Sequence, residues 1–214
     1  MTKTLFLPIL VLIVSSLTTT VVYAASAEDY LNSGNKKFMS RDYSGAIADF
    51  TKAIELSPRN AKAYSSRSNV EYFIKDYSAA LKDDNKVIEL TPKDPEAYVS
   101  RGSTKDGLKD YAGAIKDYTK AIELDPEQDI AYNARGADKS RLGDKKGAMS
   151  DFNKAIDLNP KFERAYYNRG FARSKLGDFK GAVADWNKAI ELDPLNKKEL
   201  EPRINAAKSK PKKK

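Results

Sequence analysis

Hydrophobic and polar positions recur along this chain with a period of 34 residues between residues 27 and 196. Every period closes on a near copy of one segment, which reads KAIELDP at both Lys120–Pro126 and Lys188–Pro194. The prolines that close the five periods are Pro58, Pro92, Pro126, Pro160 and Pro194. A strict period of this length indicates a stacked repeat architecture, in which one structural unit occurs five times.

The apolar positions of each unit fall on two helical faces. With the closing proline numbered position 32, the units are 27–60, 61–94, 95–128, 129–162 and 163–196. Positions 4, 8, 11 and 12 share a face of a first helix, and positions 17, 20, 21, 24, 27 and 28 share a face of a second. The proline ends the second helix, because it cannot continue the backbone hydrogen bonding. One helix pair cannot bury its apolar stripe alone, so we predict that the units stack into a solenoid with a concave surface.

Several positions keep the same residue type from unit to unit. Position 4 is always Tyr, position 20 is always Ala, position 8 is Gly except at Ser68, and position 24 is aromatic except at Asp84. Over residues 27–196 this pattern closely resembles the tetratricopeptide repeat (TPR). The resemblance implies an all-α fold, namely a right-handed α-solenoid of five helix-turn-helix TPR units plus a C-terminal capping helix. The second unit departs most from the family pattern, because Asp84 replaces a large core aromatic side chain.

Acidic and basic residues also follow the period. Position 23 is Asp in every unit, and position 7 is Arg in units two to five but Ser33 in unit one. Continuing the count beyond unit five places Arg203 at position 7. We therefore expect each Asp to pair with the Arg of the following unit, because Arg is present only where a unit precedes it. The expected pairs are Asp49–Arg67, Asp83–Arg101, Asp117–Arg135, Asp151–Arg169 and Asp185–Arg203. The alternative is a pair within one helix, such as Asp49 with Lys52.

The N-terminal segment 1–24 has the pattern of a secretory signal peptide. Lys3 precedes an apolar run from Leu5 to Val14, and Val22-Tyr23-Ala24 supplies small residues before a cut after Ala24. The alternative is an uncleaved anchor over Leu5–Val22, whose 18 residues are near the lower limit for a membrane span. We expect a secreted or periplasmic protein after cleavage, or otherwise a membrane-anchored one that faces the non-cytoplasmic side.

The C-terminal segment contains a predicted capping helix, 197–207, and a basic tail, 208–214, that we expect to be disordered. Leu200, Ile204 and Ala207 share a helical face that can cover the last unit. Of the formal net charge of +8, residues 1–24 carry +1 and residues 197–214 carry +6, which leaves +1 for the repeats. The near-neutral repeats argue against nucleic-acid binding. The tail either contacts an anionic surface weakly or only aids solubility.

The composition argues against catalysis. The chain has no Cys and no His, which excludes thiol nucleophiles, imidazole bases, disulfides and zinc sites of the usual kind. It also shows no phosphate-binding Gly-rich loop and no nucleophile–base pair. We therefore expect a monomeric interaction scaffold that is not an enzyme and that uses no cofactor or metal. The alternative is an assembly or adaptor factor tethered to a membrane by the uncleaved anchor.

In the TPR family, positions 2, 5, 9, 12 and 13 of the first helices line the concave groove. Carried over to this chain, these positions predict an apolar, aromatic end near unit one and a basic, aromatic end near unit five. The candidate groove residues are Leu31, Asn35, Phe38, Met39, Asn69, Tyr72, Phe73, Arg141, Arg164, Tyr167, Phe171 and Lys175. We expect a protein or peptide segment to bind here, with its apolar part toward unit one and its acidic part toward unit five.

Two observations limit this hypothesis. Phe38, Tyr72 and Phe73 could instead pack against neighbouring helices, as buried aromatic side chains commonly do. The carboxylate clamp of some TPR proteins needs Lys at position 5, where this chain has Leu31 and Ser65. We therefore do not expect recognition of chaperone tails of that kind.

Overall fold

The structure is a computed structural model that describes residues 25–209. Each unit contributes two α-helices, and no strand occurs within this range. The first helices are α1 (Ala27–Met39), α3 (Ala61–Phe73), α5 (Pro95–Gly107), α7 (Asp129–Arg141) and α9 (Glu163–Leu176). The second helices are α2 (Tyr43–Leu56), α4 (Tyr77–Leu90), α6 (Tyr111–Leu124), α8 (Lys145–Leu158) and α10 (Phe179–Leu192). A 3₁₀ turn, Pro194–Asn196, then leads into α11 (Lys197–Lys208).

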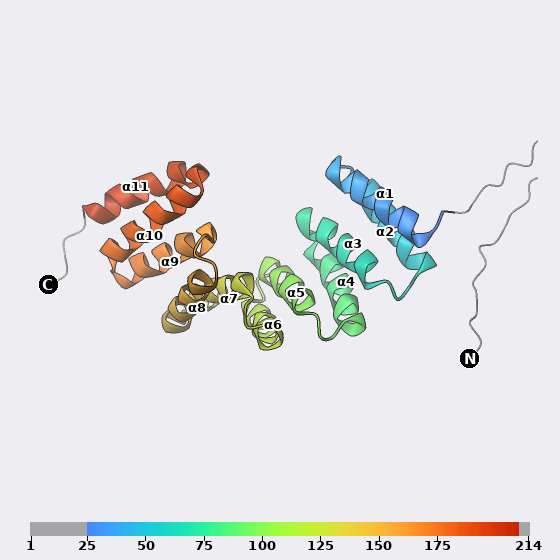
Figure 1. The fold of residues 1–214 in the computed structure, drawn as a ribbon, viewed down its shortest axis with the longest axis horizontal. Coiled ribbons are helices and arrows are strands. Elements are labelled where there is room, and N and C mark those ends of the chain that lie inside the picture. Colours follow the sequence, from blue (N-terminus) through green and yellow to red (C-terminus); the bar gives the residue numbers. More distant parts are fainter. Residues whose placement is uncertain (1–24, 210–214) are drawn as a thin grey trace, which may run out of the picture.

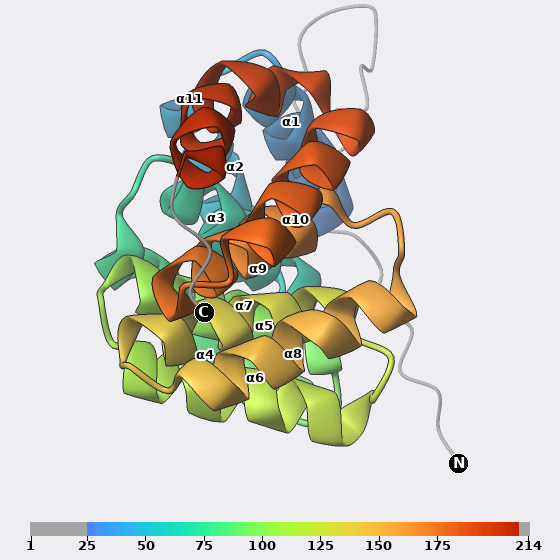
Figure 2. The ribbon, with the colours of Figure 1, turned by 90° about the vertical axis from the view of Figure 1, so that its left-hand side faces the viewer.

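The five helix pairs follow one another along an arc, so the chain forms the α-solenoid that the repeat predicted (Figure 1). The first helices α3, α5, α7 and α9 lie on the inner side of the arc, and α4, α6 and α8 lie on its outer side (Figure 1). The view in Figure 2 shows α4, α6 and α8 together along the outer edge. The predicted signal peptide and residues 210–214 of the predicted tail lie outside the described residues.

The turn between the two helices is built in the same way in every unit. Position 16 is Asp, and its carboxylate accepts a hydrogen bond from the backbone N–H three residues later, at the start of the second helix. Such a cap satisfies one of the N–H groups that a helix N-terminus leaves free. The capping residues are Asp42, Asp76, Asp110, Asp144 and Asp178. A glycine, the residue most typical of turns, precedes this Asp only in the last two units.

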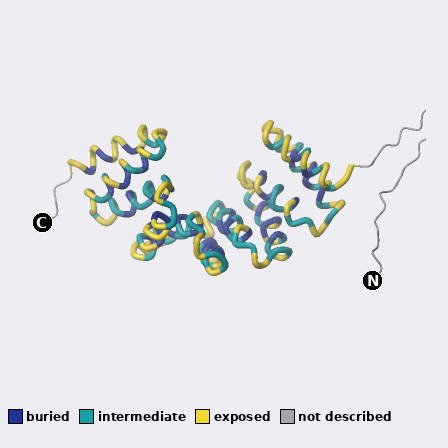
Figure 3. The backbone as a smooth tube through the Cα atoms, in the orientation of Figure 1, coloured by how far each residue is buried: buried dark blue, intermediate teal, exposed yellow. Residues whose placement is uncertain are grey.

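Close approach between the two helices of a unit depends on the pairing of positions 8 and 24. In unit one, a Cβ added to Gly34 would lie 2.6 Å from the Phe50 ring, and in unit five a Cβ on Gly170 would lie 2.5 Å from Trp186. The ring therefore rests directly on the glycine backbone. Figure 3 shows the resulting buried faces where the helices meet, with exposed residues concentrated at turns and outer faces.

Helix α11 covers the end of the solenoid. Leu200, Ile204 and Ala207 are buried in one cluster with residues of α10, including Trp186. This is the apolar face that the helical spacing predicted. Of the helices within residues 25–209, none is long and apolar enough to span a membrane.

The ion pairs differ from the predicted ladder, and that prediction is wrong in its partners. In units two to five, the Arg at position 7 binds the Asp of its own unit, with two hydrogen bonds of 2.7–3.0 Å, and not the Asp of the preceding unit. The observed pairs are Arg67–Asp83, Arg101–Asp117, Arg135–Asp151 and Arg169–Asp185. Arg203 instead stacks on the Phe171 ring, 4.8 Å from its centroid. The alternative pairing is also not observed, because Lys52 binds Glu55.

The same Arg residues still link neighbouring units through a second contact. Nη1 of each Arg donates to position 25 of the preceding second helix, which is Thr51, Asn85, Thr119 or Asn153. Each guanidinium thus connects two consecutive second helices. Unit one follows no other repeat unit, which accounts for Ser33 at this position. Asp49 of unit one pairs with Lys37 instead, at 2.7 Å.

Candidate partner-binding groove

The candidate groove is the concave face formed by the first helices of the units (Figure 1). Its N-terminal end carries an aromatic cluster of Phe38, Tyr43 and Phe73, with ring centroids 5.1–6.0 Å apart. Phe73 is nevertheless 57% exposed, and neighbouring Met39 is 86% exposed. Packing against neighbouring helices, which was the alternative to a groove role, therefore accounts for Phe38 better than for Phe73. Apolar area on this cluster remains available to a partner.

Two further predicted residues at this end differ in their accessibility. Tyr72 is exposed, and its ring contacts Tyr77 with centroids 5.4 Å apart. Leu31 is only 1% exposed, because it packs in the core of unit one with Phe50 and Val70. The prediction that Leu31 lines the groove surface is therefore wrong. Asn35 and Asn69 are exposed polar residues of α1 and α3.

The C-terminal end contains a pocket of about 350 Å³ between α7, α9 and α11. Three predicted groove residues other than Arg141 line it, namely Tyr167, Phe171 and Lys175, together with Glu199 and Arg203 of α11. The Tyr167 hydroxyl donates a 2.7 Å hydrogen bond to Glu199, and burial together with this carboxylate raises the pKa of Tyr167 to about 12. Sequence analysis assigned Arg203 to the ladder, so it missed the contribution of α11 to this pocket.

The basic character of this end rests on fewer residues than predicted. Arg141 also lines the pocket, but it is held by two carboxylates, Asp106 at 2.9 Å and Asp138, and it stacks on the Tyr111 ring. Burial and the nearby Asp106 raise the pKa of Asp138 to about 6. The charge of Arg141 is thus largely neutralised within the fold. Lys175 and Arg164 are exposed and make no ion pair within residues 25–209.

The middle of the groove contains a polar network that sequence analysis did not assign to the site. The Asp84 carboxylate accepts hydrogen bonds from the Ser68 hydroxyl of α3 and the Thr104 hydroxyl of α5. The signal in the sequence was the joint departure of Ser68 and Asp84 from the repeat pattern. No group of three or more Asp or Glu residues in the described part of the chain is placed to hold a metal ion.

Comparison of the sequence with models of known protein families identifies the family of this chain. Models described as "Tetratricopeptide repeat" match residues 31–95, 95–128 and 163–196, and one described as "TPR repeat" matches residues 141–177. The chain belongs to the tetratricopeptide repeat family. The resemblance inferred from the repeated positions is confirmed. TPR proteins bind protein or peptide partners and are generally non-catalytic scaffolds.

Solved structures show the same TPR fold. MamA is 27% identical over 77% of this chain and 96% of its own, with a TM-score of 0.68. YrrB, described as a TPR protein with an unusual peptide-binding site, is 22% identical over 83% and 92% of the chains, with a TM-score of 0.64. PilW, described as a widely conserved type IV pilus biogenesis factor, is 17% identical over 86% and 90%, with a TM-score of 0.72. Among curated protein sequences, none matches the chain.

Proposed function

We propose that this TPR protein is a non-catalytic, monomeric scaffold that holds a partner segment in its concave groove outside the cytoplasm. The observation that carries the proposal is the exposure of large apolar side chains on the inner helices, above all Met39 and Phe73. Core positions repeat from unit to unit, whereas the groove positions differ, as expected if the latter are fitted to one partner. Aromatic, Met and Arg side chains are the types enriched at protein interfaces.

The two ends of the groove suggest the polarity of the bound segment. An apolar part of the segment covers Met39, Tyr72 and Phe73, because burial of apolar surface is the main favourable term in association. An acidic part approaches Lys175 and Arg164, whose charges are not offset by an ion pair within the described residues. Arg141 contributes less, because Asp106 and Asp138 already bind it.

The proposed location rests on residues 1–24, whose pattern predicts export. Cleavage after Ala24 gives a soluble exported scaffold, and an uncleaved Leu5–Val22 gives the membrane-tethered alternative. The intact mass of the protein from soluble and membrane fractions separates the two. A mass that begins at Ala25 in the soluble fraction supports export with cleavage, and the full-length mass in the membrane fraction supports the tether.

The groove is tested by capturing partners from native extracts on immobilised protein that spans residues 25–214. Two variants probe its ends, Tyr72→Ala with Phe73→Ala, and Lys175→Glu with Arg164→Glu. Leu56→Ala is the matched apolar control, because Leu56 is exposed on a second helix away from the groove. Lys116→Glu with Lys120→Glu on α6 is the matched charge control.

A partner that is lost from either groove variant but kept by both controls supports the proposal. The first pair of substitutions is expected to weaken binding at least tenfold, because aromatic anchors contribute about 1–3 kcal/mol each at interfaces. Equal retention by all four variants would place the interface elsewhere and overturn the groove assignment.

A further inference from the structure

The seam between units two and three differs from every other seam in the solenoid. Four units seat an aromatic ring on a glycine, whereas unit two has Ser68 at position 8 and Asp84 at position 24. The Ser68 hydroxyl donates a 2.5 Å hydrogen bond to one oxygen of Asp84. The Thr104 hydroxyl donates a 2.6 Å hydrogen bond to the other. A polar triad from α3, α4 and α5 thus replaces an aromatic contact.

The third member of the triad is also specific to this seam. Thr104 is at position 10 of unit three, and the other units have residues that cannot donate a hydroxyl there, namely Lys36, Val70, Asp138 and Ala172. Two departures from the repeat, Ser68 and Asp84, therefore meet a hydroxyl donor that is found at the variable position 10 only in unit three. A substitution that merely weakened unit two would not need a matching donor on the next unit.

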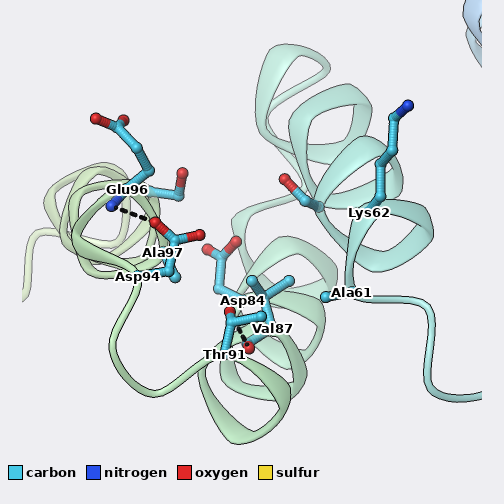
Figure 4. A pocket seen from close by; sticks show the side chains of 10 residues that line it. Ala61, Lys62, Asp84, Val87, Thr91, Asp94, Glu96 and Ala97 are labelled. Carbon is cyan, nitrogen blue, oxygen red and sulfur yellow. Dashed lines mark hydrogen bonds between the residues drawn. The ribbon is translucent and has the colours of Figure 1, made fainter.

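Loss of the aromatic ring leaves open space beside the triad. One pocket of about 250 Å³ lies between α3, α4 and α5 and has Asp84 in its wall (Figure 4). A second pocket of about 190 Å³ continues along α3 and α5 and is bordered by Ser68 and Thr104. Ser100 borders both pockets, and we call the first one, with Asp84 in its wall, the hydroxyl slot. Ser65 and Ser100 line this slot, and Ser68 and Thr104 reach its Asp84 from the neighbouring pocket.

Within residues 25–209, the carboxylate in the slot forms no salt bridge with a cation. Asp84 is 2% exposed, and both of its hydrogen-bond donors are neutral hydroxyls. Lys62 lines the same pocket, but its ammonium group points away from Asp84 (Figure 4). Arg101 lies near enough to attract Asp84, but its guanidinium is bound to Asp117. Burial raises the pKa of Asp84, although the two hydroxyl donors counteract this. A buried carboxylate without a counter-charge is unfavourable, so the slot favours the arrival of a cation.

The mouth of the slot has the same sign of charge as its wall. Asp94 and Glu96 at the start of α5 line the pocket, so carboxylates outnumber Lys62 there. Negative groups around a recess attract cations and raise their local concentration. A ligand that enters between α3 and α5 therefore meets carboxylates first and the Asp84–hydroxyl triad last.

We propose that the hydroxyl slot binds the ammonium group of a lysine side chain in the partner segment. The ammonium is a compact charge with three donors, which suits one carboxylate surrounded by hydroxyl acceptors. The narrow aliphatic stem of lysine can follow the recess while its head reaches Asp84. The inference rests on the proposed groove function and adds a specificity determinant between its apolar and basic ends.

The slot is tested with a capped peptide, acetyl-Gly-Lys-Gly-amide, titrated into isotopically labelled protein and followed by amide NMR. The matched ligand is the same peptide with norleucine, which keeps the stem and lacks the charge. The lysine peptide is expected to shift amides of Ser68, Ser100 and Thr104 with saturation in the millimolar range. Equal shifts with the norleucine peptide, or shifts scattered over the exposed acidic residues of the molecule, would overturn the proposal.

Two variants separate binding from folding. Asp84→Asn keeps the side-chain shape, and it is expected to weaken lysine binding at least tenfold while preserving the spectrum. Ser68→Gly with Asp84→Phe restores the pair found in the other units, and it is expected to raise the urea midpoint and abolish binding. Unchanged affinity in Asp84→Asn would overturn the proposal. A partner that still requires Tyr72 and Phe73 would then show that the groove function stands without the slot.

Discussion

At the scale of single residues, position 15 of each unit adopts a left-handed backbone conformation, and only the last two units have glycine there. Gly143 and Gly177 have φ of 88° and 84° in the last two units. Arg41, Lys75 and Lys109 take the same left-handed region, with φ of 64–66°. A side chain with Cβ is disfavoured there, so the first three turns carry strain that the last two avoid.

Lys109→Gly is therefore expected to stabilise the protein by about 1 kcal/mol, because it removes this strain at an exposed position. Gly143→Ala is expected to destabilise it by a similar amount, even though no atom lies near the added Cβ. Urea unfolding followed by circular dichroism measures both changes. Lys116→Gly inside α6 is the control and should destabilise by about 1 kcal/mol. Loss of stability in Lys109→Gly would show that the left-handed turn is not strained.

Position 11 shows a second departure in unit two. Four units place a basic residue there, and it binds the Asp at position 23; the pairs are Lys37–Asp49, Lys105–Asp117, Lys139–Asp151 and Arg173–Asp185. Unit two has Glu71 instead, which is 8% exposed and has one buried oxygen without a hydrogen-bond partner in the described structure. Burial, followed by the charge of Asp83, raises the pKa of Glu71 to about 7.

This carboxyl makes stability depend on pH in a defined direction. The unfolded chain loses the Glu71 proton near its ordinary pKa of 4.5, whereas the folded protein keeps it up to about pH 7. Below pH 4.5 the titration of Glu71 therefore does not lower the free energy of unfolding. As the pH rises from about 4.5 to 7, Glu71 lowers the free energy of unfolding by an increasing amount. Glu71→Gln is expected to match the wild type near pH 4 and to exceed it by about 2 kcal/mol near pH 8.

Urea unfolding of both proteins across this pH range measures the difference. Glu55→Gln is the control, because Glu55 is exposed and pairs only with Lys52. Its effect should stay small at every pH. A constant difference between Glu71→Gln and the wild type would contradict the assigned titration.

At the scale of helices, the sequence shows that the Arg residues at position 7 pair with the Asp residues at position 23, but it does not show which unit supplies the Asp. Arg67 follows Asp49 by 18 residues and precedes Asp83 by 16, and both separations join a first helix to an adjacent second helix. The exceptions at Ser33 and Arg203 favoured the wrong choice. In the fold, the dependence on a preceding unit comes from the contact with position 25, which the sequence pattern did not distinguish.

Arg135→Ala is expected to cost about 3 kcal/mol, because it removes a guanidinium from the buried Asp151 carboxylate and from Thr119 of the preceding unit. Arg203→Ala should cost less than about 0.5 kcal/mol, since Arg203 is exposed. Double-mutant cycles by urea unfolding identify the partner. Energetic coupling between Arg135 and Asp151 is expected. Coupling between Arg135 and Asp117 instead would contradict this pairing and support the predicted pairs between units.

The sequence could predict which helices carry the groove residues, but it could not predict which of these residues are exposed. Spacing and family position placed Tyr72, Phe73 and Tyr167 on the inner helices, as the structure shows. They could not show that Leu31 is buried, because its burial depends on contacts with Phe50 of α2 and Val70 of α3. They also could not show that Arg141 is held by Asp106, which lies on another unit 35 residues away.

At the scale of the whole molecule, each unit contacts its neighbours along the chain, so stability is propagated from unit to unit. The C-terminal end depends on α11, which buries Leu200 and Ile204 against α10. Within residues 25–209, no helix precedes α1 to cover the N-terminal end, and the exposed Met39 lies on α1. In the part of the chain that the structure describes, a covering helix is therefore present at the C-terminal end.

Leu200→Asp with Ile204→Asp is expected to detach α11, because burying two charges against Trp186 is more unfavourable than exposing the apolar face. Amide hydrogen exchange in α9 and α10 should then accelerate at least tenfold, whereas α1 to α4 should keep their protection. Glu201→Asp on the exposed side of α11 is the control and should leave both ends unchanged. Equal acceleration in all five units would show that the solenoid unfolds as a single cooperative body, in which α11 is not a local cap.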